Sequence, residues 1–112
     1  MSSIDFNLRE KKYLTITLNN EKKTTIMVLS PSKKVMNKLV RIKDLIGNES
    51  KDISEDEQIN LLYETCSIVM SRNKGGITIE KELLEEIFDI DDVQFFLNKY
   101  MEFVGSRIKG KN

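Results

Sequence analysis

Apolar and polar positions alternate strictly over residues 13–18, where Leu14, Ile16 and Leu18 take one side of an extended chain. Alternation with a period of two predicts a half-buried strand. Residues 24–29 are rich in β-branched side chains and follow a polar loop of five residues, so we expect the two segments to pair as a β-hairpin. Because a lone hairpin is marginal in water, this one must pack on helices or pair with another chain.

Beyond Pro31 the apolar positions recur every three or four residues, which is the period of an amphipathic helix. Gly47 is placed to end the first helix, and Thr78 is placed to cap the third. Ser54 and Glu57 form a capping box before the second helix. The predicted helices cover residues 32–46, 55–73, 79–88 and 90–108. The sequence therefore predicts an α+β fold, mostly α, in which an N-terminal hairpin precedes four helices.

The chain of 112 residues is expected to form a single domain, 1–112, with flexible ends at residues 1–8 and 109–112. Its apolar runs are shorter than the roughly 18 residues that a membrane helix needs. The opening segment "MSSIDFNLREKK" mixes acids and bases and lacks an apolar signal core. We therefore expect no membrane span and a cytoplasmic location.

The helices carry more apolar side chains than one stripe per helix requires. In the second helix Leu61 and Ile68 point away from the main stripe, so this helix is either buried on all sides in its own domain or gives one face to a partner. In the fourth helix Phe95 lies nearly opposite the core stripe, and Phe103 flanks that stripe. Together these four residues form a candidate partner-binding surface.

Residue chemistry argues against catalysis. Histidine is absent and Cys66 is the only cysteine, so zinc sites, histidine acid–base catalysis and nucleophile triads each lose a usual component. Cys66 falls on an apolar stripe and is expected to be a buried, inert thiol. The acids of residues 80–92 alternate with inward apolar positions, which favours a solvated face over paired catalytic carboxylates. The sequence predicts a protein that is not an enzyme and that uses no metal or cofactor.

Charge is segregated along the chain, although the formal net charge is zero. Residues 1–47 carry ten lysines and arginines against four acids, and residues 48–103 carry five against fourteen. A basic half attracts nucleic acid, but the acidic half would repel the same polyanion. Self-association between the basic half of one copy and the acidic half of another fits this pattern at least as well, and nucleic-acid binding is not expected.

The order of elements and the stretch "ITIEKELLEEIFDIDDVQFFLNKYMEFV" resemble the small tail assembly chaperones of tailed bacteriophages and prophages. The most specific part is an acidic helix that leads, through "DIDD", into an aromatic-rich helix ending "YMEFV". The resemblance implies a protein of the bacterial host cytoplasm that binds the tape-measure protein and keeps its hydrophobic helices soluble during tail assembly. It names the tail-tube protein as a further candidate partner.

Two alternatives stay open at this point. The chain could be a structural or connector component of a phage tail, in which case it would be found in finished particles. It could also be a small regulatory adaptor that binds DNA or a protein partner through its basic N-terminal half.

Overall fold

The computed structural model describes residues 2–47 and 54–108. Its elements, in chain order, are a 3₁₀ turn at Phe6–Leu8, strands β1 (Leu14–Thr17) and β2 (Thr25–Val28), and helices α1 (Lys33–Gly47), α2 (Glu55–Ser71), α3 (Lys81–Ile87) and α4 (Ile90–Ile108). The predicted α+β, mostly α, architecture is confirmed. Of the two ends predicted to be flexible, residues 6–8 form the 3₁₀ turn, and residues 109–112 lie outside the described residues.

The hairpin is antiparallel, with Leu14 opposite Val28 and Ile16 opposite Ile26. Its loop is closed by Asn20, whose side-chain oxygen accepts a hydrogen bond from the Thr24 backbone N–H at 3.0 Å. The apolar face of the hairpin lies against the helices, as the alternation of the sequence predicts, because Ile26 and Val28 are buried there.

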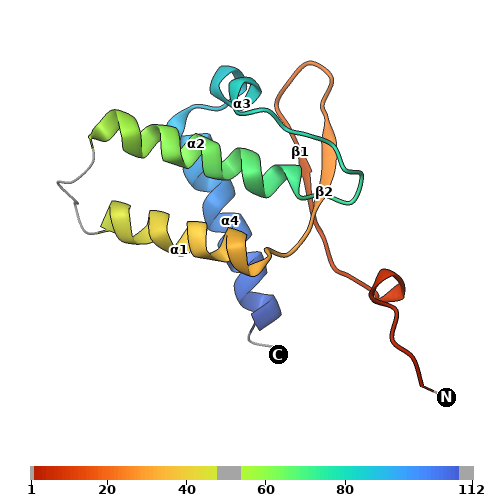
Figure 1. Cartoon of the computed structure of the whole chain (residues 1–112). Helices are drawn as coiled ribbons and strands as arrows, with labels where there is room; N and C mark the ends of the chain where they lie inside the picture. Colours follow the sequence, from red (N-terminus) through yellow and green to blue (C-terminus); the bar gives the residue numbers. More distant parts are fainter. Residues whose placement is uncertain (1, 48–53, 109–112) are drawn as a thin grey trace.

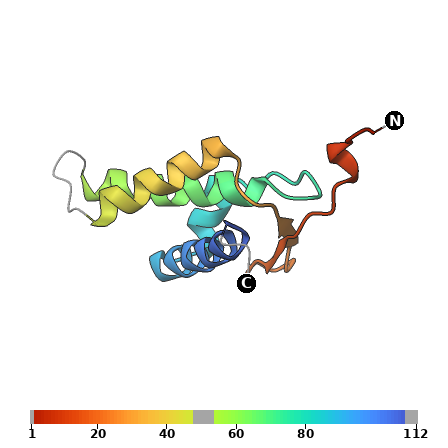
Figure 2. The same cartoon turned by 90° about the horizontal axis from the view of Figure 1, so that it is seen from below.

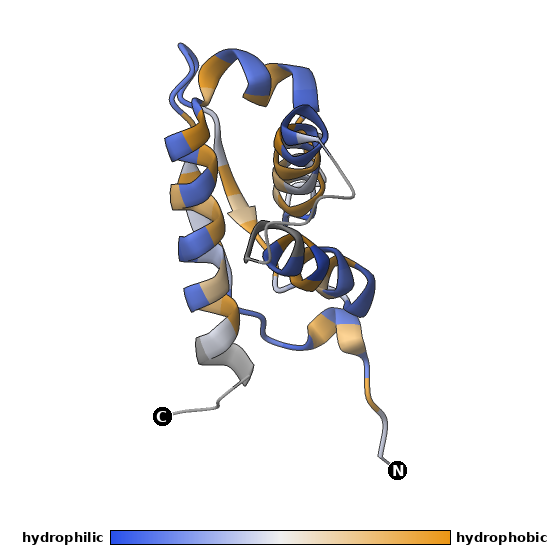
Figure 3. Ribbon diagram, turned by 90° about the vertical axis from the view of Figure 1, so that its left-hand side faces the viewer, coloured by the Kyte–Doolittle hydropathy of each residue, from blue (hydrophilic) through white to orange (hydrophobic). Residues whose placement is uncertain are grey.

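Helix α2 is the centre of the fold and contacts α1, α3, α4 and β2. Helix α1 runs alongside α2, and α4 passes across this pair (Figure 1). The helices turn their apolar stripes toward one another and their polar stripes outward (Figure 3). The core that results has fully buried side chains from β2, α2, α3 and α4, among them Val28, Cys66, Met70, Leu84 and Tyr100.

Two tyrosines connect helices α2 and α4 to neighbouring segments through hydrogen bonds of their hydroxyl groups. The Tyr63 hydroxyl of α2 donates to the Phe88 carbonyl at 2.7 Å, and the Tyr100 hydroxyl of α4 donates to the Leu29 carbonyl at 2.9 Å. Each buried phenol thus brings its polar end to an acceptor between elements. Burial raises the pKa of Tyr100 to about 12, although Arg72 acts in the opposite direction.

The link between α2 and α3 is held by Asn73, which is buried. Its side-chain amide donates to the carbonyls of Met70 and Ile77, and its oxygen accepts from the Ile77 N–H at 2.9 Å. Asn73 also forms a β-bridge with Val28, and the Lys74 N–H donates to the Met27 carbonyl. This link therefore covers the edge of β2 that faces away from β1.

The helix starts show one confirmed and one wrong prediction. The Ser54 hydroxyl accepts from the Glu57 N–H and caps α2 as expected. Thr78 does not cap α3, which begins later than predicted, after Glu80. The reason is tertiary: Ile79 is buried, and hydroxyl groups of α2 hold its backbone, with Ser71 accepting from its N–H and Ser67 donating to its carbonyl. A backbone held in this way is not free to enter the helix.

Candidate functional site

The four residues of the predicted partner-binding surface differ in exposure. Leu61 and Ile68 of α2 are half-buried and pack against the core, which agrees with a central helix that is covered by its own domain. Phe103 of α4 is also half-buried, with its ring centroid 6.1 Å from that of Tyr100. Phe95 differs from the other three, because 65% of its surface is exposed. Their role as a surface stays a prediction, and Phe95 is the member that lines an open groove.

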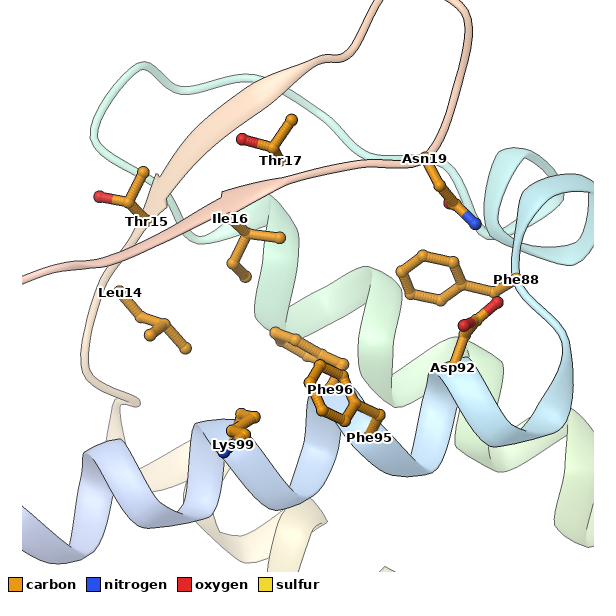
Figure 4. A pocket seen from close by; sticks show the side chains of 10 residues that line it. All are labelled: Leu14, Thr15, Ile16, Thr17, Asn19, Phe88, Asp92, Phe95, Phe96 and Lys99. Atoms are coloured by element: carbon orange, nitrogen blue, oxygen red, sulfur yellow. The ribbon is translucent and has the colours of Figure 1, made fainter.

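The first groove, here called the strand-edge groove, lies between β1 and α4 and has a volume of about 410 Å³. Leu14 and Ile16 point from β1 toward Phe96 on α4 (Figure 4). Phe88 and Phe95 also line it, so its walls are largely aromatic and aliphatic.

Two charged residues of α4, Asp92 and Lys99, lie at opposite ends of the strand-edge groove (Figure 4). The Lys99 ammonium is 5.7 Å from the centre of the Phe95 ring, within the range of a cation–π contact. Asp92 helps to cap α4, since its carboxylate accepts from the Asp89 N–H while Asp89 accepts from the Asp92 N–H. A ligand in this groove would therefore meet an apolar floor with an acid at one end and a base at the other.

The groove adjoins the outer edge of β1. The Leu18 N–H donates to the Thr24 carbonyl at 2.8 Å, so Leu18 and, by alternation, Ile16 and Leu14 direct their backbone groups toward β2. The backbone N–H and C=O groups of Thr15 and Thr17 must then point outward. In the described part of the chain no strand pairs with this side of β1, whereas the opposite edge of the sheet is covered by the link at Asn73.

A second groove, here called the three-helix groove, opens on the other side of α4. It has a volume of about 480 Å³ and is lined by apolar side chains of α1, α2 and α4, namely Leu39, Ile42, Leu62, Leu97 and Met101. Gln94, Asn98 and Lys43 complete the lining, and Lys43 is the only charged residue among them.

A third depression is polar. Arg9, Lys11, Lys12 and Arg72 line it together with Glu10 and the segment 29–31. The Arg72 side chain is held in place there, because its Nε donates to the Ser30 carbonyl at 2.8 Å. The chain that leads into β1 therefore runs beside the segment that follows β2.

The ionisable groups of the interior offer little reactivity. Cys66 is fully buried, and burial raises the pKa of its thiol to about 12, which keeps it protonated and unreactive at neutral pH. Burial also raises the pKa of Tyr63, with the nearby Asp89 adding to the effect. Within residues 2–47 and 54–108, no group of three or more His, Cys, Asp and Glu side chains is placed to hold a metal ion.

Comparison with known protein families, with curated proteins and with solved structures finds no match to this chain. Among the described residues, none of the helices combines the length and the apolar character needed to cross a lipid bilayer.

The three-helix groove could not be found by reading the sequence. Leu39, Ile42, Leu97 and Met101 occupy or flank the apolar stripes of their helices, and each stripe alone predicts burial. The groove forms where α1 and α4, which both pack on α2, contribute side chains to one surface. The alternation of residues 13–18 assigns side chains to the two faces of the strand and gives no signal for which edge of β1 is exposed.

Proposed function

We propose that this protein is a non-catalytic tail assembly chaperone, and that its three-helix groove binds an amphipathic helix of the tape-measure protein. The observation that carries the proposal is the groove itself, an open apolar surface bounded by three helices with one charged residue in its lining. Amphipathic helices are recognised in this mode, with the apolar face of the ligand laid into a hydrophobic groove. The resemblance of the sequence to tail assembly chaperones supplies the identity of the client.

The side chains around the groove suit a client with many similar helices. Met101 is half-buried, and a flexible thioether adapts to apolar partners of different shape. The neighbouring surface of α1 is basic, with Lys38, Arg41 and Lys43 exposed. We therefore expect the client helix to carry acidic residues beside its apolar stripe.

The decisive experiment is co-expression of the chain with the longest coiled-coil protein encoded just downstream of its gene, followed by a pull-down. Met101→Glu places a charge in the groove and is expected to reduce client retention about tenfold or more, the effect of losing an apolar anchor. Met101→Leu keeps the groove apolar and serves as the matched control. Both variants are compared by thermal unfolding, so that a loss of fold is not mistaken for a loss of binding.

Two results would contradict the proposal. Equal retention of the client by Met101→Glu and Met101→Leu would show that the groove is not the binding site. A chain that fails to bind the client but co-purifies with finished tails would instead be a structural component, and salt-sensitive retention on duplex DNA without client binding would favour the regulatory adaptor.

A further inference from the structure

The segment that precedes β1, residues 4–10, here called the arm, carries large apolar side chains that have no place in the core. Ile4, Phe6 and Leu8 are 82%, 70% and 81% exposed. The arm projects away from the body of the protein (Figure 2). Its apolar residues alternate with the polar residues Asp5 and Asn7, which is the pattern of a strand with one apolar face.

The strand-edge groove offers the two things that such a strand needs, a strand edge to pair with and an apolar surface to cover. It combines outward-facing backbone groups at Thr15 and Thr17 with an apolar floor that contains Phe95. A strand added to this edge would place every second side chain over the groove and pair its backbone with β1. Ile4, Phe6 and Leu8 have the spacing that this geometry requires.

We infer that the arm of one copy of this protein pairs with the outer edge of β1 in a second copy and fills its strand-edge groove. The inference does not rest on the proposed chaperone function, because it uses a different groove and requires no client. The occupant is a second copy because residues 9–12 lie beside segment 29–31 and Arg72, which leads the arm away from the β1 edge of its own chain.

Charge favours an antiparallel orientation of the arm. In an extended strand Glu10 lies on the same face as Ile4, Phe6 and Leu8, so in the paired strand it points toward α4. An antiparallel arm brings Glu10 to the Leu14 end of the groove, where Lys99 lies, whereas a parallel arm brings it to the Asp92 end (Figure 4). Opposite charges meet only in the antiparallel case.

The antiparallel arrangement also gives a closed dimer. When the arm of copy one pairs with β1 of copy two, a two-fold axis between the copies places the second arm on the first β1 in the same way. Both arms and both free edges are then used, and the expected product is a dimer. The 3₁₀ turn at Phe6–Leu8, which contains no buried residue, must open. Its backbone bonds run from the Leu8 N–H to Asp5 and from the Arg9 N–H to Phe6, and the exposed Asp5 carboxylate accepts from the N–H and the side-chain amide of Asn7.

Sedimentation velocity of the full chain, measured over about a hundredfold range of protein concentration, tests the inference. The wild-type chain is expected to shift from its monomer mass of 13.0 kDa to twice that mass. Phe6→Ser in the arm and Phe95→Ser in the groove should each weaken the dimer about tenfold or more, as the loss of a buried aromatic anchor does. Val40→Ser, at an exposed position of α1 outside both grooves, is the matched control and should leave the dimer unchanged.

Mixing the two variants gives a further test. Phe6→Ser retains an intact groove and Phe95→Ser retains an intact arm. A mixed dimer therefore keeps one unaltered arm–groove contact, and the mixture is expected to dimerise at a lower protein concentration than either variant alone. A wild-type chain that stays monomeric throughout, or a dimer that Phe6→Ser leaves unchanged, would overturn the inference. Phe6 lies outside the core, so its replacement tests the contact without threatening the fold. Client retention by a monomeric chain would refute arm exchange and leave the chaperone proposal standing.

Discussion

Asn73→Ala should be among the most destabilising single polar substitutions in this protein. The asparagine side chain makes three hydrogen bonds to backbone groups, at 2.8 Å to the Met70 carbonyl, 2.7 Å to the Ile77 carbonyl and 2.9 Å from the Ile77 N–H. Each such bond contributes about 1 kcal/mol net, and a partner left buried without a bond costs more. The expected loss is therefore about 3 kcal/mol of unfolding free energy, a large part of the stability of a small domain.

Urea unfolding followed by circular dichroism measures this loss, as a lower transition midpoint at an unchanged slope. The melting temperature should fall by roughly 13 °C. Asn60→Ala, at an exposed position on α2, makes the same chemical change and is expected to alter stability by less than about 0.5 kcal/mol. If the two variants unfold at the same urea concentration, the assignment of Asn73 as the residue that holds the α2–α3 link is wrong.

Three further outcomes follow from burial. Leu84→Ala empties space around a fully buried side chain of α3 and should cost about 3 kcal/mol in a urea titration, and a cost below about 1 kcal/mol would contradict that packing. Cys66 should react with a thiol reagent only upon unfolding, so rapid labelling of the native protein would show that α2 opens. Folding raises the pKa of Tyr100 from 10.0 to about 12, so its stabilisation is complete below pH 10 and is lost as the pH rises toward 12. The alkaline loss of stability should be smaller in Tyr100→Phe, and an unchanged profile would argue against a buried Tyr100 phenol.

Local patterns were sufficient to predict the two strands and the four α-helices of this fold, but not the 3₁₀ turn at Phe6–Leu8, which lies in an end predicted to be flexible. Strict alternation identified β1, and the period of apolar residues identified all four helices. The start of α3 was missed because serines of α2 hold the backbone of Ile79, and contacts between distant segments leave no signature in a local pattern. For the same reason a helical wheel left open whether the face of Leu61 and Ile68 was covered, which depends on how α2 packs among its neighbours.

The candidate site was predicted in part. Phe95 stood out in the sequence because it lies opposite the core stripe, and it does line a groove. Much of the rest of that groove comes from β1, a segment that is distant in the sequence. Among the described residues the outer edge of β1 pairs with no strand, and the link at Asn73 covers the other edge of the hairpin. The side chains that line a groove are brought together by the packing of strands and helices that are distant in the sequence. This packing is visible only in the structure.

The two grooves lie on different sides of α4, and this arrangement predicts that client binding and dimer formation are independent. Phe95 and Met101 are six residues apart, a rise of about 9 Å along the helix. Between them the buried Tyr100 holds α4 in place through its bond to the Leu29 carbonyl, so we expect a change in one groove to leave the other unaltered. Substitutions at such separations usually add within about 0.5 kcal/mol.

Phe95→Ser should therefore leave client retention within about twofold of the wild-type value, and Met101→Glu should leave the dimer dissociation constant within the same range. Pull-down and sedimentation on both variants and on the double variant measure the two effects separately. If Phe95→Ser strengthens client retention by tenfold, the arm and the client compete for one surface, and assigning a separate groove to each is wrong.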